Sequence, residues 1–293
     1  MFPEKLSMRL IQLVADKIDK NRRGVAIEIG VGTSNFYSEI YKSLEFKTIA
    51  VDPIPFPPFV ELSLEKDIIY DESCIYKNNG PLTLYISALS DLSSLHSNWW
   101  GVKQSNSKTV IGQTFSSFIE KHQIERITFL KIDTEGSELE IIQQLSSSNN
   151  DLLPEVLEFE YGGGCSKSEG HGGWSPEFYS KLLKIIELLK QMGYSQGIIL
   201  DSIDLEPNVF TFESISNPDT IFKPYFEYGN LVAFKKPINN LESIKVKILE
   251  EQNIYLKNYI DTLKKENRSL STNLLRKDYI QRIKNKFNHL LNK

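Results

Sequence analysis

The chain has 293 residues, of which 40% are hydrophobic and 25% charged, and its formal net charge is −4. This balance is typical of a globular α/β domain with an appendage, and the mild acidity argues against the basic surface that nucleic-acid partners require. No apolar run reaches the roughly 18 residues that span a bilayer, and the amino end lacks a signal-peptide core, so we expect a cytoplasmic protein. Cys74 and Cys165 have neither zinc-site nor disulfide spacing, which indicates reduced thiols.

Hydrophobic periodicity predicts alternating helices and strands within residues 1–237. Apolar residues at helical spacing predict a lead-in helix in residues 1–22 that packs on the sheet edge. The expected strands are 25–29, 48–51, 82–87, 127–132, 155–160, 196–200 and 230–235, and the further helices are 34–44, 114–122, 137–146 and 176–191. This order predicts an α/β fold with a doubly wound, mostly parallel, seven-stranded sheet, whose last two strands form a hairpin-like pair.

The first predicted strand ends in the glycine turn Gly30-Val31-Gly32, which precedes a helix. Glycines let a backbone approach a ligand closely, and the amino end of a helix presents free N–H groups beside it. The next strand ends on Asp52, about 20 residues later, where a carboxylate suits a ribose diol. The third glycine of a dinucleotide fingerprint is missing, which favours a phosphate-free nucleoside such as S-adenosylmethionine. The alternatives are a tight turn for the glycines and a strand-end cap for Asp52.

Carboxylates gather where the predicted strand 127–132 ends. Asp133, Glu135 and Glu138 follow that strand and precede an amphipathic helix. Open α/β sheets bind ligands at the carboxyl ends of their strands, so Asp133 is the first candidate for a base or an acceptor-orienting group, and Glu135 is the second. The alternative is that Asp133 caps the helix and that Glu135 and Glu138 favour its positive end.

A glycine-dense segment, residues 161–174, follows the next predicted strand. It is typical of a mobile cover over a substrate, with His171 as a further candidate base, and an exposed linker without a catalytic role is the alternative. Glu160, at the carboxyl end of its strand, is better placed than Glu158 to face the same site. Asp133, Glu160 and His171 offer ligands for Mg²⁺, but their spacing does not demand a metal, so we expect none.

Six stretches follow one another along the chain in a recognisable order. They are Glu28-Ile29-Gly30-Val31-Gly32, Asp52-Pro53, Gly80 to Asp91, Lys131 to Glu138, Leu157 to Glu160 and Met192-Gly193-Tyr194. In this order they resemble the FkbM-type S-adenosylmethionine-dependent methyltransferases over roughly residues 20–236, with Lys131 to Glu138 as the most specific element. Two departures are that Glu28 and Val31-Gly32-Thr33 replace the usual Asp-x-Gly-Ala-Asn, and that the loop from Pro53 to Asn79 is long.

The resemblance implies a Rossmann-like class I methyltransferase fold, with one terminal strand antiparallel, and S-adenosylmethionine as the cofactor. Gly30 and Gly32 would bring backbone against the amino-acid portion of the cofactor, Glu28 would hold its ammonium group and Asp52 its ribose. The end of the third predicted strand would line the adenine pocket through Ser87 and Ala88, unless these residues serve ordinary strand packing. The substrates that the resemblance implies are sugar hydroxyls and polyketide or lipid-linked intermediates.

The composition changes after Pro237 and becomes polar and almost free of glycine and proline. Leucine recurs at every seventh residue, and β-branched residues and asparagine fill the alternate seam position: Leu249, Leu256, Leu263, Leu270 and Val246, Asn253, Ile260, Asn267, Leu274. Buried asparagine pairs fix register between identical copies, so residues 238–293 predict a parallel coiled coil that makes the protein a homodimer. A single helix packed back on the domain is the alternative.

The tail ends in a basic amphipathic stretch. Its basic residues alternate with apolar ones and are Arg276, Lys277, Arg282, Lys284, Lys286 and Lys293. This pattern is typical of a helix on an anionic membrane surface, which would make the protein peripheral to the membrane. A continued oligomer helix with a solvated basic face is the alternative.

Together these features favour a S-adenosylmethionine-dependent O-methyltransferase that acts on a hydroxyl of a saccharide or glycan precursor. Two other interpretations stay open. One is a non-catalytic coiled-coil scaffold with a degenerate nucleoside-binding domain. The other is an NAD-dependent nucleotide-sugar enzyme, which the missing third glycine disfavours.

Removal of residues 241–293 should yield a soluble monomer, because the heptad seam carries the predicted interface. Analytical sedimentation of the full and the shortened chain measures this. A shortened chain that still sediments as a dimer would place the interface in the globular part.

Overall fold

The structure, a computed structural model, describes residues 2–88, 90–102, 106–147, 149–204, 206–251 and 254. The described residues up to 239 belong to one compact unit, and those from 240 onward belong to a second. Residues 241–251 are helical, whereas the heptad positions from Asn253 onward and the basic end lie outside the described residues, so the coiled coil and the membrane contact stay predictions. Within the described part of the chain, no helix combines the length and apolar character that crossing a bilayer requires.

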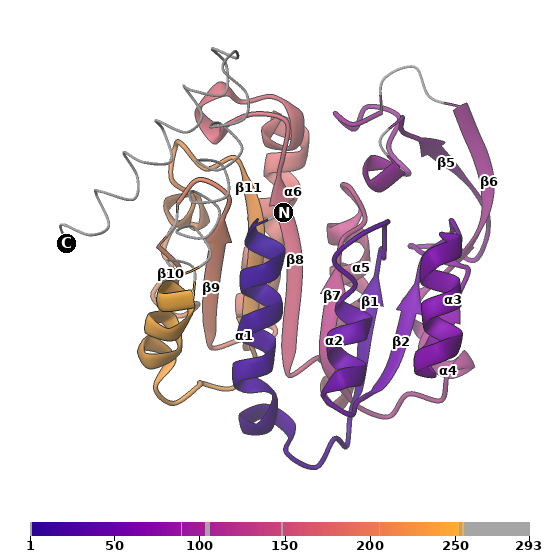
Figure 1. Ribbon diagram of the computed structural model, residues 1–293. Helices are drawn as coiled ribbons and strands as arrows, with labels where there is room; N and C mark the ends of the chain where they lie inside the picture. Colours follow the sequence, from indigo (N-terminus) through magenta and orange to yellow (C-terminus); the bar gives the residue numbers. More distant parts are fainter. Residues whose placement is uncertain are drawn as a thin grey trace, which may run out of the picture. The chain divides into compact units, whose positions relative to one another are not determined.

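A large mixed sheet organises the first unit (Figure 1). Its eight strands hydrogen-bond in the order β10-β9-β11-β8-β7-β1-β2-β3. Their bounds are β1 (Val25–Ile29), β2 (Lys47–Val51), β3 (Ile69–Asp71), β7 (Ile127–Ile132), β8 (Val156–Gly162), β9 (Gln196–Asp201), β10 (Asn208–Thr211) and β11 (Tyr228–Phe234). Every residue of β1 and β7 is buried, because helices cover both faces of these strands.

The sheet has eight strands, so the expectation of seven is wrong. The predicted strand 82–87 exists as β5 (Gly80–Ile86), but it pairs antiparallel with β6 (Asn106–Gln113) in a separate three-stranded sheet that also holds β4 (Cys74–Ile75). The outer strands β3 and β10 of the main sheet have three and four residues, too few for hydrophobic alternation to reveal them. Much of β6 is exposed, which removes its apolar signal as well.

The strands that lead to the predicted site run in one direction. β1 pairs in parallel with β2 and β7, β7 with β8, and β2 with β3. β11 enters between β8 and β9 and is antiparallel to both, so the antiparallel last strand implied by the resemblance is present. β10 is also antiparallel to β9. The carboxyl ends of β1, β2, β7 and β8 therefore share one edge of the sheet, where ligands bind in open α/β folds.

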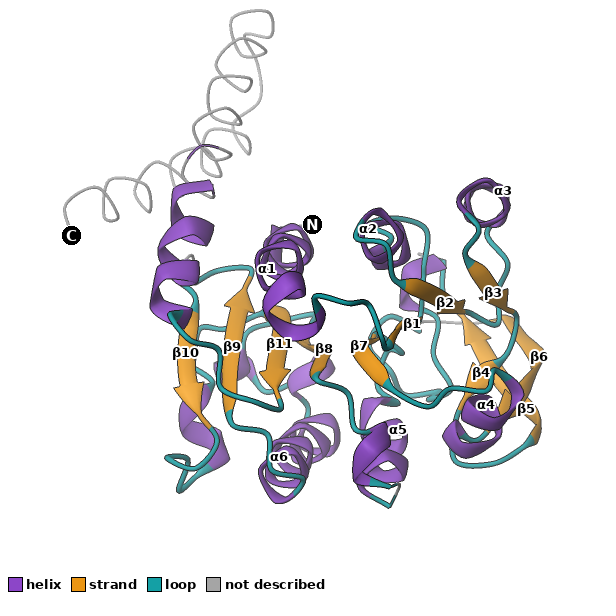
Figure 2. Cartoon of the chain, turned by 90° about the horizontal axis from the view of Figure 1, so that it is seen from below, coloured by secondary structure: helices purple, strands orange, loops and turns teal. Residues whose placement is uncertain are grey.

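Helices cover both faces of the sheet (Figure 2). One face carries α1 (Phe2–Asp19), α2 (Tyr37–Ser43) and α3 (Pro57–Lys66), and the other carries α4 (Phe115–Lys121), α5 (Glu138–Ser146) and α6 (Pro176–Gln191). The lead-in helix α1 contacts β11 and β9 inside the sheet, not its edge as expected, and so buries Leu10 and Val14. The sequence does not predict α3, whose prolines stand in the first turn, where a missing N–H costs no helical bond.

Asp19 connects the end of α1 to two neighbouring strands. The residue is 5% exposed, and its Oδ2 accepts hydrogen bonds from the Gly24 N–H at 2.9 Å and from Thr128 Oγ1 at 2.7 Å. Burial raises the pKa of this carboxyl, but the bonds to Asp19 outweigh burial and lower its pKa below the usual 3.8. The ionised carboxylate therefore stabilises the fold above about pH 4, and this contribution is lost as the pH falls through the lowered pKa.

Asp19→Ala should lower the free energy of unfolding by about 1–3 kcal/mol at neutral pH, because two buried donors lose their acceptor. Urea denaturation at several pH values measures this, and the difference from the wild type should shrink below about pH 4. Asp16→Ala is the matched control: it removes an exposed carboxylate that pairs with Arg22 and should cost less than about 1 kcal/mol. Equal losses in the two variants would contradict the role of Asp19.

Candidate active site

The ends of β1 and β7 touch where the glycine turn begins. The Asp133 N–H donates to the Ile29 carbonyl at 2.8 Å, and a Cβ at Gly30 would lie 1.7 Å from the Asp133 carbonyl oxygen. Gly30 also has a φ of +83°, so this position combines a close backbone approach with a left-handed conformation. Both constraints require glycine there, and they hold the glycine turn against the acidic end of β7.

Asp52 connects the end of β2 to the same turn. Its Oδ2 accepts hydrogen bonds from the N–H groups of Val31 at 2.9 Å and Gly32 at 3.2 Å, and its Oδ1 accepts one from Ile54 at 2.8 Å. Burial raises the pKa of Asp52, and these backbone bonds oppose the shift. A carboxylate has about four acceptor positions, so Asp52 retains capacity for a ligand hydroxyl.

Glu28 is buried and bonded to the first turn of α2. Its Oε1 accepts the Tyr37 N–H at 3.0 Å, while Oε2 accepts the N–H of Ser38 at 2.7 Å and a short bond from the Ser38 hydroxyl. Burial raises the pKa of Glu28 to about 7, and the three bonds oppose the rise. Glu28 therefore positions the helix that follows the glycine turn, in addition to lining the cavity described below.

The segment after β5 reaches the glycine turn through a different residue from those expected. Ser87 donates through its hydroxyl to the Gly101 carbonyl at 2.7 Å, and Ala88 is exposed; neither residue lines the cavity. Asp91 lines it instead and accepts the Thr33 hydroxyl at 2.6 Å. Sequence reasoning missed Asp91 as a site residue, although the stretch Gly80 to Asp91, which contributes to the family resemblance, ends on it.

The loop between β7 and α5 is organised by Glu138. Its carboxylate accepts the Thr134 N–H at 2.9 Å, the Thr134 hydroxyl at 3.0 Å and the Gly136 N–H at 3.1 Å. The N-cap residue of α5 is Ser137, and no side chain among the described residues caps this helix, so the capping role considered for Asp133 is not seen. Because the loop is closed on itself, Glu135 adopts a φ of +55°, and its carbonyl accepts the Ser94 hydroxyl at 2.6 Å.

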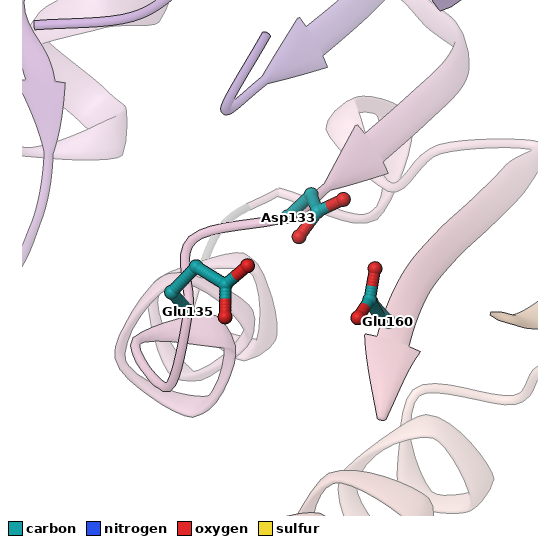
Figure 3. Close-up of side chains that lie close together, drawn as sticks. All are labelled: Asp133, Glu135 and Glu160. Carbon is teal, nitrogen blue, oxygen red and sulfur yellow. The ribbon is translucent and has the colours of Figure 1, made fainter. Parts of the chain in front are cut away.

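Three carboxylates meet at this edge and are here called the carboxylate triad: Asp133 at the end of β7, Glu135 in the following loop and Glu160 near the end of β8 (Figure 3). One oxygen from each lies within 4.8 Å of those of the other two. Burial, and then the neighbouring carboxylates, raise the pKa values of Glu135 and Glu160 well above the usual range. Glu158, in contrast, accepts a bond from the Tyr37 hydroxyl at 2.7 Å, so the structure selects Glu160 for the site, as predicted.

Lys131 is the basic partner of the triad. It is 1% exposed, and its Nζ donates to Asp133 Oδ2 and to Asn230 Oδ1, both at 3.2 Å. Burial lowers the pKa of an ammonium, but the Asp133, Glu158 and Glu160 carboxylates outweigh it and raise the pKa of Lys131. The lysine therefore stays charged and orients Asp133.

The structure does not bring His171 to the triad. His171 is exposed and does not line the cavity, and its carbonyl accepts the Cys165 thiol at 2.8 Å. The glycine-dense segment packs against Trp100: a Cβ at Gly163 would lie 2.9 Å from Trp100 Nε1. The segment is therefore closely packed in this structure, with glycines where the indole of Trp100 approaches.

A cavity of about 550 Å³ is lined by the glycine turn, Asp52, Asp91 and the carboxylate triad. Its acidic lining residues are Glu4, Glu28, Asp52, Asp91, Asp133, Glu135 and Glu160, whereas Lys131 is its only basic lining residue among those described. A second hollow, of about 40 Å³, shares the triad and is also lined by Trp99, Phe178 and Lys181. The large cavity has the size of a small-ligand site, and its charge suits a cationic ligand.

Comparison with protein families agrees with this arrangement. Residues 21–195, more than half of the chain, match the model of the methyltransferase FkbM domain. No curated protein matches the chain. The matched range contains the glycine turn, Asp52 and the whole carboxylate triad.

Proposed function

The chain belongs to the FkbM methyltransferase family, and on this basis we propose that it transfers a methyl group from S-adenosylmethionine to a hydroxyl of a saccharide or glycan precursor. Family membership supports methyl transfer. The cofactor, the oxygen acceptor and the sugar are the proposed parts, and each draws on the chemistry of the cavity.

The charge of the cavity carries the proposal for the cofactor. S-adenosylmethionine supplies, when bound, a methyl group on a cationic sulfonium that a nucleophilic oxygen can displace. Seven acidic residues and one lysine line the cavity, which favours a ligand with sulfonium and ammonium charges. The same acidic lining opposes the diphosphate of NAD, which normally binds to a glycine-rich helix start without carboxylates around it.

Individual residues have distinct proposed roles in binding. Gly30 and Gly32 bring the backbone of the turn to the ligand, and Asp52 uses its remaining acceptor positions for ribose hydroxyls. Glu28 positions α2 through the three bonds that its oxygens accept, and its remaining acceptor position holds the ammonium group of the cofactor.

Asp133 and Glu135 are the residues proposed to act on the acceptor. Methyl transfer to oxygen requires the acceptor hydroxyl in line with the methyl group and a route for its proton. Asp133 is held at the end of β7 by its backbone bond to β1 and by the Lys131 ammonium. Its carboxylate can therefore orient a hydroxyl and accept its proton, and Glu135 is the neighbouring alternative. The exposed position of His171 gives no support to its candidacy as the base.

Calorimetry of the full chain with S-adenosylmethionine tests the proposal. We expect saturable binding of this ligand and at least tenfold weaker binding of NAD, because the acidic cavity opposes phosphates. Tighter binding of NAD would support the oxidoreductase alternative. Binding of neither ligand would favour the non-catalytic scaffold.

Asp133→Asn should lower the rate of methyl transfer by about 10²–10⁴-fold, because the amide keeps the shape but cannot accept the hydroxyl proton. Affinity for S-adenosylmethionine should change little. Transfer of labelled methyl groups to glycan-precursor extracts measures the rate, and calorimetry the affinity. Asp16→Asn, which alters an exposed carboxylate outside the cavity, is the control. Undiminished transfer by Asp133→Asn would remove Asp133 from the mechanism.

A further inference from the structure

We propose that the carboxylate triad binds one divalent cation, Mg²⁺ or Mn²⁺, between β7 and β8. The sequence does not require a metal at these residues, and His171, the nitrogen ligand it offers, is exposed and outside the cavity. The tertiary structure instead assembles three oxygen ligands: Asp133, Glu135 and Glu160 (Figure 3). Carboxylate oxygens are the ligands that these hard cations prefer.

The spacing of the triad is compatible with octahedral coordination. Bonds of about 2.1 Å to Mg²⁺ place adjacent ligand oxygens about 3 Å apart and opposite ones about 4 Å apart. The triad oxygens already lie within 4.8 Å of one another, so small side-chain rotations suffice. The three residues come from two strand ends and one closed loop. The bonds from Glu138 to Thr134 and Gly136 hold that loop in place.

The charges around the triad are unbalanced without a cation. The triad carries up to three negative charges, and Lys131, bonded to Asp133 Oδ2 at 3.2 Å, supplies one positive charge. The three carboxylates face one another (Figure 3), and all three line the cavity, where the other acidic lining residues add to the negative potential. A divalent cation supplies the two positive charges that Lys131 does not.

An independent observation points to a ligand in the same cavity. Ser137, at the start of α5, is 1% exposed, and its hydroxyl has no hydrogen-bond partner among the described residues. A buried hydroxyl without a partner costs free energy, so it marks a position where something else binds. Ser137 lines the same cavity as the triad. A cation at the triad, or a water molecule bound to that cation, would give this hydroxyl a partner.

The role of the cation rests on the proposed methyl transfer. Three carboxylates leave about three of six octahedral positions open, enough for two adjacent oxygens of an acceptor. A vicinal diol, as in a sugar ring, offers such a pair. A hydroxyl bound to a cation loses its proton more readily, so the proton passes to the Asp133 carboxylate, the O–CH₃ bond forms, and the S–CH₃ bond breaks to give a neutral thioether. Atoms and charge balance in this step.

Titration of Mn²⁺ into the full chain, followed by electron paramagnetic resonance and without donor or acceptor, tests the cation site. We expect one Mn²⁺ per chain, displaced by excess Mg²⁺. Glu160→Gln and Glu135→Gln should each weaken binding at least tenfold, because each removes one of three charged ligands. Ser137→Ala should weaken it less. Asp16→Asn, which alters an exposed carboxylate outside the cavity, should leave the affinity within about twofold.

The outcomes separate the two proposals. Absence of saturable Mn²⁺ binding, or binding that neither glutamine variant weakens, overturns the cation site. Thermal unfolding checks that each variant is folded. If one glutamine variant is not folded, the Mn²⁺ affinity of the other decides the test. S-adenosylmethionine binding is measured separately in the presence of a chelator. Mn²⁺ binding without S-adenosylmethionine binding would leave the cation site standing and overturn the cofactor proposal.

Discussion

The close contact between Gly30 and the carbonyl of Asp133 is the constraint on which the site depends. A side chain at Gly30 would overlap that carbonyl. The Asp133 N–H also donates a hydrogen bond to the Ile29 carbonyl at the same contact. Two loops that are about 100 residues apart in sequence are thereby held in direct backbone contact. Asp52 is bonded to the glycine turn on one side of this contact, and the carboxylate triad lies on the other side. Every role proposed for the cavity relies on that fixed relation.

Electrostatics then decides what the cavity can accept. Burial and mutual repulsion disfavour ionisation of Glu135 and Glu160, and Lys131 offsets only part of the negative charge. Such an arrangement is costly to the fold when no ligand is bound. The cationic cofactor and the divalent cation proposed above would both relieve this cost. The proposed methyl transfer and the proposed cation site thus follow from one excess of carboxylates.

The parts of the fold that carry strong periodic patterns were predictable. β1, β2, β7 and β8 are apolar runs that end in glycine or acidic residues, and the sequence places each within a residue or two. β3, β6 and β10 are short or exposed, so they lack such a pattern, and β5 consequently appeared to belong to the main sheet. α3 lies in a proline-rich stretch whose sequence predicts a stiff loop. Prolines occur both in the first turn of a helix and in loops, so the sequence pattern does not distinguish the two.

The sequence by itself determined the order of strands and helices, the glycine turn, the acidic strand end and the family, because each depends on residues that are close together in the chain. It also identified Glu160 as the better-placed glutamate of its strand, since Glu160 stands nearer the carboxyl end, where ligands bind. Only the tertiary structure decided that Glu135 and Glu160 meet Asp133, that Asp91 and not Ser87 lines the cavity, and that His171 stays outside. These outcomes depend on distances between elements far apart in sequence, and packing sets those distances.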